Sequence, residues 1–532
     1  MTRAVRTLVA RWRASLVSDP WRAAGVASVA LCIACGSAAF AAVSRVLSTG
    51  DETAHVDYAY QVWLGHLPVF EHGLVFRPPV LTVPPVQVEA QHPPLFYALL
   101  APFVGPLING GHWVAAVQVG RAVCVVIAVA CVLALAWAGS LVSTRRPAVW
   151  AISVPAVVAP FSPFMRVGGS VYSDNLATLF SVLALGVGII AVRRGVSVRL
   201  VILAAVFAAG GMLSHATFVI TLLVLVGALV LGVWMHGGGS WPSRIGRSAL
   251  IGAVPLASAA IASGWFYLRN KHLTGTYTGG HSDWSEQHLQ RVHRPFSDII
   301  TWRLFWNTNL QLLRQAGGTD AWLGPRLLEV AAGAGVLAGV VLLVRRHGRV
   351  EATQLAVVLV LAVQVVGTLV TEAGYVSGGG GIITRYLLPA LLPFGCLLAA
   401  GILALPRLLS GLALLAYLAI AWGFFLRWAW VQPIKDGSHW SGHTANHVPW
   451  SLVTIALAGV ALTALLQACA VTWARAATNG ADGQPGASAP PAAPAARPSR
   501  HRAVKRPSPS RDVIPVEPVG RSAAGGAEVR PG

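Results

Sequence analysis

Charged side chains are scarce in this sequence: Asp, Glu, Lys and Arg together make up 11% of its 532 residues. A soluble domain averages about 25%, so the deficit excludes an ordinary soluble protein. Hydrophobic residues make up 55% of the chain. They gather in runs of about 20, long enough to cross the hydrocarbon core of a bilayer as helices. The composition therefore predicts an all-α polytopic membrane protein.

Several signatures are absent as well. The sequence has no P-loop, GxSxG or HExxH motif. Its six cysteines are scattered, and Cys32 and Cys35 form a lone CxxC inside the first apolar run, so neither a disulfide framework nor a cysteine zinc site is expected. The predicted span interiors are nearly free of charge and show no repeat, which disfavours a channel or transporter.

The net charge of +20 does not indicate a nucleic-acid partner. The basic residues stand in short clusters between apolar runs and in the C-terminal segment, which is the positive-inside pattern of membrane proteins and not a DNA-binding face. This bias predicts a multi-pass plasma-membrane protein with both termini in the cytoplasm. Most of the acidic residues then fall outside, so we expect an extracytoplasmic active site.

About twelve transmembrane helices are predicted. The spans are 22–46, 114–139, 148–164, 175–192, 199–214, 216–235, 248–268, 322–344, 353–373, 383–404, 408–428 and 450–473. The first is longer than the apolar segment of a signal peptide and is expected to stay uncleaved. A further stretch, 93–107, carries four prolines and is expected to be re-entrant or interfacial.

The spans and their loops form one predicted membrane domain, residues 1–475. Its outer loops 1 and 4, about 47–113 and 269–321, are long, and a shorter outer loop covers about 429–449. Loops of this length are usually functional or disordered, and we expect the two long ones to be ordered lids. Residues 476–532 are rich in Pro, Ala, Ser and Arg and predict a disordered basic cytoplasmic tail.

An acidic pair follows the first span directly, in the stretch GDETAHVDYAY. Asp51 and Glu52 lie at the membrane boundary, where a charge must be hydrated or paired. If residues 52–64 are helical, Asp51, His55 and Tyr58 share one face. A carboxylate beside a histidine in a partly desolvated cleft suits a general base. The same residues could also serve only as a helix cap.

Three other outer segments carry candidate residues. QHPPLFYALLAPF places His92 before an aromatic run, and YSDNLA places Asp174 at the outer start of a span as a cap, a functional acid or both. SGGGGIITRYLLPALLPF leads through four glycines to Arg385 and Tyr386. A glycine-rich loop beside an arginine suits a phosphate, although Arg385 could also extend to the interface.

A histidine cluster stands in the last outer loop. His439, His443 and His447 are spaced by four, so on a helix they would share a face and could hold a metal. No carboxylate with a clear role accompanies them. No metal ligand is therefore assigned, and a requirement for a divalent metal stays open.

Together these segments resemble the membrane glycosyltransferases of the GT-C superfamily, and are similar to dolichyl-phosphate-mannose protein mannosyltransferases and aminoarabinose transferases. The resemblance spans roughly residues 10–475 and rests on the order, spacing and sidedness of the four motifs. It implies a many-helix bundle that takes a sugar from a polyprenyl phosphate. It maps the catalytic acids onto Asp51, with Glu52 beside it, and onto Asp174, and maps a late arginine onto Arg385.

The implied reaction transfers the sugar with inversion to an envelope acceptor, which could be a glycan, a glycolipid or a protein. Asp51 would act as the base, and Arg385, helped by His92 or Arg77, would stabilise the lipid phosphate. The lipid-linked sugar is a substrate, and no cofactor is assigned. The residues expected to bind substrate are His55, Tyr58, Arg77, His92, Arg385 and Tyr386.

Two alternative functions would also need an apolar groove between the helices for the prenyl chain, and basic loops. One is a non-enzymatic polyprenyl-lipid carrier, transporter or scaffold of envelope polysaccharide assembly. The other is an enzyme of the O-antigen ligase or polymerase type, which would depend on outer arginines and histidines more than on a carboxylate base. The Ala, Gly, Arg and Pro content is typical of a GC-rich bacterial genome and hence of an envelope glycan.

Overall fold

The computed structural model describes residues 19–78, 85–314, 323–345, 351–435 and 438–482. Within these ranges the chain is all-helical, with no strand and one isolated β-bridge between His443 and Pro449. The predicted fold class, an all-α polytopic membrane protein, is confirmed for this part. Residues 483–532, most of the predicted tail, lie outside the described ranges.

The helices follow one another with short connections, except at the two long loops. In chain order they are α2 Pro20–Val43, α3 Glu52–Trp63, η1 Phe70–His72, η2 Val88–Gln91, α4 Leu95–Asn109, α5 Trp113–Val142, α6 Pro147–Val158, α7 Ser162–Gly169, α8 Asp174–Arg194, α9 Val198–Ser214, α10 Phe218–His236, α11 Trp241–Thr274, α12 Ser282–Leu289, α13 Phe296–Thr301, α14 Arg303–Asn309, α15 Leu323–Arg345, α16 Ala352–Ser377, η3 Thr384–Ala390, α17 Leu391–Ala404, α18 Arg407–Lys435, η4 Ser438–Ser441 and α19 Trp450–Asp482. The last helix runs past the boundary predicted at residue 475.

Nine of the described helices are long and apolar enough to cross a membrane, and the bent pair α6 and α7 could add a tenth. The predicted number of twelve is therefore not confirmed. The span predicted over 148–164 is broken by an 81° bend. Pro160 lacks a backbone donor for the helix, and the chain becomes extended at Phe161 before α7 begins. The 17 residues of α9 extend about 25 Å, short of the roughly 30 Å core.

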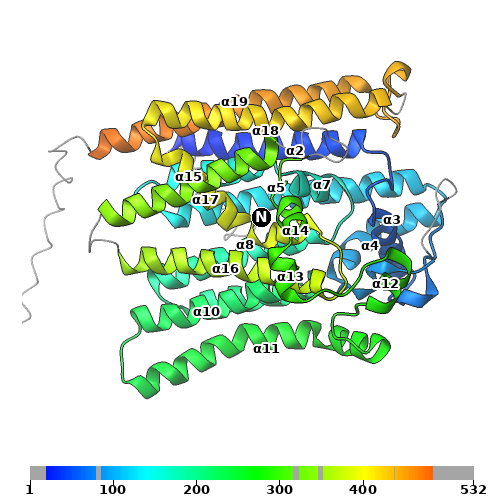
Figure 1. The fold of residues 1–532 in the computed structure, drawn as a ribbon, viewed down its shortest axis with the longest axis horizontal. Helices are drawn as coiled ribbons and strands as arrows, with labels where there is room; N and C mark the ends of the chain where they lie inside the picture. The colour runs from blue at the N-terminus through cyan, green and yellow to red at the C-terminus, as the bar shows by residue number, and fades with distance from the viewer. Residues whose placement is uncertain (1–18, 79–84, 315–322, 346–350, 436–437, 483–532) are drawn as a thin grey trace, which may run out of the picture. The chain divides into compact units, whose positions relative to one another are not determined.

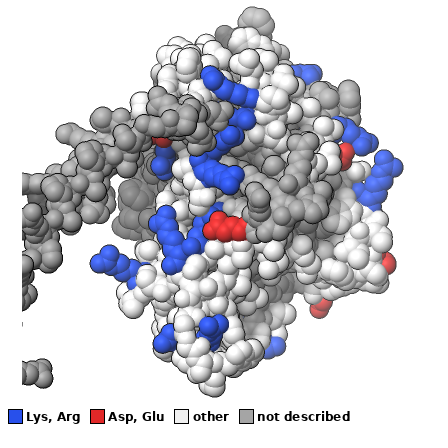
Figure 2. Space-filling model, turned by 90° about the vertical axis from the view of Figure 1, so that its left-hand side faces the viewer, with Lys and Arg blue, Asp and Glu red and all other residues white. Residues whose placement is uncertain are grey.

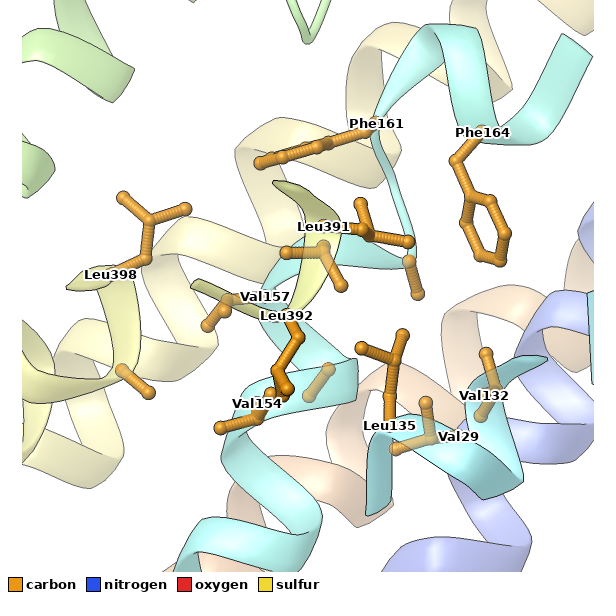
Figure 3. Packing of buried hydrophobic residues seen from close by; sticks show 14 of the residues in the cluster. Val29, Val132, Leu135, Val154, Val157, Phe161, Phe164, Leu391, Leu392 and Leu398 are labelled. Atoms are coloured by element: carbon orange, nitrogen blue, oxygen red, sulfur yellow. The ribbon is translucent and has the colours of Figure 1, made fainter. Parts of the chain in front are cut away.

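The core of the bundle consists of apolar side chains from α2, α5, α6, α17 and α18. Figure 3 shows Val29 of α2, Leu135 of α5 and Leu392 of α17 coming together there. Each is fully buried, and burial of such a side chain contributes about 1.5–3 kcal/mol in water. Between helices in lipid, close packing replaces much of that contribution.

The two ends of the bundle differ in chemistry. The short helices of the long loops, α3, α4 and α12, gather at one end (Figure 1), which we call the site end. The loops between α5 and α6, α8 and α9, and α10 and α11 lie at the opposite end. Figure 2 views that opposite end and shows many Lys and Arg side chains with few acids. The positive-inside rule would place it in the cytoplasm.

Candidate active site

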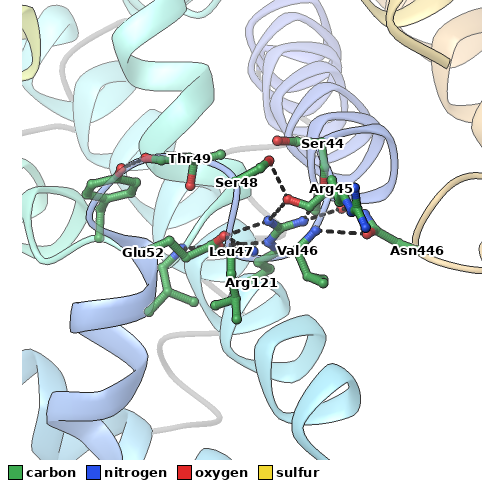
Figure 4. Close-up of polar contacts among 12 residues, drawn as sticks. Ser44, Arg45, Val46, Leu47, Ser48, Thr49, Glu52, Arg121 and Asn446 are labelled. Carbon is green, nitrogen blue, oxygen red and sulfur yellow. Dashed lines mark hydrogen bonds and ion pairs between the residues drawn. The ribbon is translucent and has the colours of Figure 1, made fainter. Parts of the chain in front are cut away.

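Arg121 of α5 fixes the loop that follows α2. Its side chain is fully buried and donates hydrogen bonds to the carbonyls of Ala41 and Ser44, each at 2.7 Å, and of Arg45 at 3.1 Å. The end of a helix leaves such carbonyls without an intrahelical donor. The amide of Asn446, far along the chain, donates to two of the same carbonyls. Figure 4 shows both side chains converging on this turn.

Glu52 is the ion-pair partner of Arg121. Its Oε1 lies 2.8 Å from Arg121 Nε and its Oε2 lies 2.7 Å from Nη2, in a bidentate pair. The backbone N–H groups of Leu47 and Val171 donate to the same carboxylate at 2.9 and 3.1 Å. The catalytic role predicted for Glu52 does not fit these contacts, because four donors occupy its two oxygens in a site without water access. Glu52 instead holds the loop that carries Asp51.

Arg385 joins two carboxylates that lie far apart in the sequence. Its Nη2 is 2.7 Å from Asp51 Oδ2, and its Nε is 3.2 Å from Asp174 Oδ2. Asp51 is the N-cap of α3, Asp174 begins α8 and Arg385 belongs to η3. The Asp51 side chain is 40% exposed, whereas those of Asp174 and Arg385 are 5% and 13% exposed. The structure therefore brings together the three residues on which the sequence hypothesis depends.

Aromatic rings and a second guanidinium surround Arg385. Its Cζ lies 4.8 Å from the ring centroid of Tyr172 and 5.6 Å from that of Tyr386, within the range of cation–π attraction. Arg166 of α7, which is half-buried, lies 5.8 Å from the same Tyr172 ring. Two guanidinium groups thus flank one tyrosine, a suitable arrangement for a phosphate.

The backbone before Asp51 is tied to Arg166 and Tyr172. The carbonyl of Thr49 accepts a hydrogen bond from Arg166 Nη2 at 2.6 Å and another from the Tyr172 hydroxyl. Gly50 follows with φ of +81°, and a Cβ there would lie 3.3 Å from Arg166 Nη2. The turn therefore requires glycine, both for its left-handed backbone and for the close approach of the guanidinium.

A buried acid and two histidines lie behind this turn. Glu89 Oε2 is 2.9 Å from His92 Nε2 and 3.5 Å from His55 Nε2, and His55 Nδ1 is 2.8 Å from the Tyr97 hydroxyl. Burial is the main cause that raises the pKa of Glu89 well above its usual range and lowers the pKa of His55 well below its own. Burial likewise lowers the pKa of His92 to about 4. Burial therefore favours the uncharged form of all three groups, with the proton on Glu89.

His215, between α9 and α10, connects that cluster to Asp174. Its ring centroid lies 4.2 Å from that of His92, and its Nε2 lies 3.9 Å from Asp174 Oδ1. The ring also meets Tyr386 edge-on at 5.5 Å. Burial and the neighbouring His92 lower the pKa of His215 to about 3, so the ring is neutral at physiological pH.

The other predicted substrate-binding residues lie apart from the two acids. Tyr58 packs on Tyr97, with ring centroids 3.6 Å apart, and donates to the His92 carbonyl at 2.9 Å. Tyr58 therefore holds the backbone of the segment that carries His92 and makes no direct contact with the two acids. Arg77 is exposed and donates to the Leu74 carbonyl at 3.3 Å. Among the described residues, no contact joins Arg77 to Asp51 or Arg385. This position does not support the predicted role of Arg77 in stabilising the lipid phosphate.

The sequence analysis did not predict four residues of the site. Glu89 stands three residues before His92, a spacing that is compatible with a contact between the two side chains. Arg121 is a single charge inside a 30-residue apolar helix, which should mark an internal partner. His215 is a lone histidine between two apolar runs. Arg166 carried no signal, because its segment reads as the end of a span.

Metal ligands do not gather in the described part of the chain: no group of three or more His, Cys, Asp or Glu side chains is placed to hold a metal ion. The guanidinium of Arg385 stands between Asp51 and Asp174, where a divalent cation would need to bind both. The divalent metal that the sequence left open therefore does not fit this arrangement of side chains.

The predicted histidine face in the last outer loop is absent. Residues 442–449 form turns and a bridge instead of a helix, so His443 and His447 do not share a helical face. Both are exposed. The side chain of His439 lies outside the described ones.

No family model and no curated protein matches the chain. Among solved structures it is similar to ArnT from Cupriavidus metallidurans bound to undecaprenyl phosphate, at 14% identity and a TM-score of 0.43, over 86% of this chain and 78% of that one. It is also similar to the oligosaccharyltransferase of Archaeoglobus fulgidus tethered with an acceptor peptide, at 14% identity and a TM-score of 0.41, over 86% of this chain and 56% of that one.

A further similarity is to archaeal AglB from Archaeoglobus fulgidus in complex with an inhibitory peptide and a dolichol-phosphate, at 13% identity and a TM-score of 0.39, over 82% of this chain and 55% of that one. These proteins are GT-C glycosyltransferases, the class that the sequence resembles. At such identities and TM-scores the likenesses decide neither family nor activity, and the functional inference rests on this chain's own side chains.

Proposed function

We propose that this protein is an integral membrane glycosyltransferase that moves a sugar from a polyprenyl-phosphate donor to an envelope acceptor at the extracytoplasmic face. The observation that carries the proposal is the position of Arg385. One guanidinium at the site end contacts both Asp51 and Asp174. A phosphate binder beside a half-exposed carboxylate is the minimum that such a transfer needs.

Asp51 is the residue best placed to activate an acceptor hydroxyl. Its side chain is 40% exposed, and only Oδ2 is paired, with Arg385. No contact of the described residues occupies Oδ1. That oxygen can accept the proton of an acceptor arriving from the aqueous side, which is the geometric condition for a general base.

Asp174 is suited to positioning rather than to proton transfer. It is nearly buried and begins α8, where the helix dipole favours a negative charge. Its ion pair with Nε, 3.2 Å long and without hydrogen-bond geometry, keeps the Arg385 guanidinium beside α8. The role we assign it is to hold Arg385 so that its remaining donors face the lipid phosphate.

Two guanidinium groups are available to a phosphate here, those of Arg385 and Arg166. Both lie near the ring of Tyr172, so a phosphate beside that ring can meet both. Planar guanidinium groups bind phosphate bidentately and stay charged at any physiological pH. They would stabilise the charge that develops on the leaving phosphate.

The reaction then proceeds as a single displacement. The acceptor oxygen forms a bond to the anomeric carbon while the bond from that carbon to the phosphate oxygen breaks. The acceptor proton passes to Asp51, and both electrons of the broken bond leave with the polyprenyl phosphate, held by Arg385 and Arg166. Attack from the face opposite the leaving group inverts the anomeric centre.

The proposal is tested with the purified chain in lipid nanodiscs, supplied with polyprenyl-phosphate-linked arabinose, mannose or glucose and a cell-envelope extract as acceptor. We expect one donor to release polyprenyl phosphate, with the sugar recovered in a product of opposite anomeric configuration by NMR. Binding of all donors without release would instead support a carrier or scaffold. A product of retained configuration would contradict the single displacement.

A further inference from the structure

The arrangement of charges around Arg385 poses a problem for phosphate binding. A single guanidinium serves Asp51 and Asp174 together. A phosphate that binds the remaining donors of Arg385 shares its single positive charge with both carboxylates. Asp51 is 40% exposed and can turn to water. Asp174 is 5% exposed, and a buried carboxylate whose cation is shared with a second anion is destabilised.

The titratable group closest to Asp174 besides Arg385 is His215. Its Nε2 is 3.9 Å from Asp174 Oδ1, is buried, and has no hydrogen-bond partner among the described residues. On the other side of the ring, Nδ1 accepts a hydrogen bond from the Thr217 N–H at 3.2 Å and lies 3.0 Å from the Thr217 hydroxyl oxygen. The neutral ring therefore carries its proton on Nε2. A second proton on Nδ1 would exchange the bond from the Thr217 N–H for a bond to the hydroxyl oxygen.

We propose that His215 is a reserve cation of this site: it takes up one proton when a lipid phosphate engages Arg385, and it then balances the charge of Asp174. The inference rests on the proposed function, because it assumes that the phosphate binds at Arg385. His215 is thus a positioning residue and makes no contact with the reacting atoms. No bond to the sugar is made or broken in this step, and the proton comes from solvent.

Burial is the main reason why the pKa of His215 is low before the phosphate arrives, and the groups that face the ring modify this effect. Asp174 from α8 favours the charged ring, whereas Arg385 from η3 and His92, whose ring is 4.2 Å away, disfavour it. Tyr386 meets the ring edge-on. A phosphate paired with Arg385 offsets the positive charge that opposes protonation of His215 and leaves Asp174 as the nearest ion, so both changes favour protonation.

His92 is the competing site for the proton. It stacks on His215, and its Nε2 lies 2.9 Å from Glu89 Oε2. A proton that moved from Glu89 to His92 would create charge without uptake from solvent. The two possibilities therefore differ in proton stoichiometry, and a calorimetric measurement separates them.

The test is isothermal titration of the full chain in detergent with undecaprenyl phosphate at about pH 8, where a phosphate monoester with its second pKa near 6 is already doubly ionised. Repeating the titration in buffers of different ionisation enthalpy gives the number of protons taken up. We expect the wild type to take up protons on binding, in a number that rises toward one as the titration is repeated at lower pH. His215→Asn and His215→Gln should show only the uptake that the lipid phosphate itself contributes. The control His112→Asn, at an exposed histidine before α5, should behave as the wild type does.

The affinity gives an independent readout. Uptake of one proton makes the affinity fall about tenfold for each pH unit between the pKa of His215 in the free protein and its higher pKa in the bound protein. This dependence should vanish in both His215 variants, whose unfolding transitions show whether they are folded. Failure of the wild type to bind undecaprenyl phosphate would overturn the proposed function itself. Binding without proton uptake, or equal uptake in folded His215→Asn, would overturn only the role of His215.

Discussion

Replacing Asp51 by asparagine should reduce kcat for sugar transfer by about 10²–10⁴-fold, the contribution of a positioned general base. Asparagine keeps the shape of the side chain, and its carbonyl oxygen can still accept from Arg385. It cannot take a proton from the acceptor hydroxyl. The release of polyprenyl phosphate by purified variant and wild type, measured at saturating donor, gives the ratio directly.

Arg77→Ala is the matched control for this substitution. Arg77 lies in the same outer loop, is exposed and makes its contact with a local carbonyl, so its loss should leave kcat within about twofold of the wild type, as for an ordinary surface substitution. Turnover by Asp51→Asn within tenfold of the wild type would remove Asp51 from the role of base. Asp174 would then be the next carboxylate to examine.

Replacing Arg121 by methionine should lower the free energy of unfolding by about 3–5 kcal/mol, the usual cost of leaving one member of a buried ion pair alone. Glu52 would keep its charge in a fully buried position. The carbonyl of Arg45 would also lose its donor, and the carbonyls of Ala41 and Ser44 would keep only the Asn446 amide. Unfolding in mixed micelles, followed by tryptophan fluorescence, measures the change.

The double variant Glu52→Gln with Arg121→Met separates a structural role of Glu52 from a catalytic one. Because it removes both charges, it should recover part of the stability that Arg121→Met loses. Arg121→Lys should keep only part of the stability that Arg121→Met loses, since one ammonium cannot replace the five donors of a guanidinium. A Glu52→Gln protein with normal stability and no turnover would restore the catalytic role that the sequence predicted.

The apolar runs predicted the helices well because lipid imposes the same demand on each of them. A spanning segment must satisfy its own backbone hydrogen bonds, so length and hydrophobicity suffice to find it. The same signal does not report a bend. The segment 148–164 reads as one span, yet its prolines divide it into α6 and α7, and the bend brings Arg166 of α7 to the site end.

The site was predicted in part. The four motifs pointed to Asp51, Asp174 and Arg385, and these residues do meet. The function of Glu52 could not be read from its neighbours, because its partner Arg121 lies 69 residues away. Pairings of this kind depend on how α2 and α5 pack, and no local spacing encodes them. Glu89 and His215 were missed for the same reason: each acquires meaning only from a side chain on another element.

The most direct test of the whole account compares binding of undecaprenyl phosphate with turnover in three proteins: wild type, Asp51→Asn and Arg385→Gln. We expect Asp51→Asn to bind the lipid at least as tightly as the wild type does and yet to transfer no sugar. Arg385→Gln should bind about 10–100-fold more weakly, because hydrogen bonds to a charged group contribute about 1.5–3 kcal/mol. If Arg385→Gln binds the lipid phosphate as tightly as the wild type does, Arg385 is not the phosphate-binding residue and the proposed function is wrong.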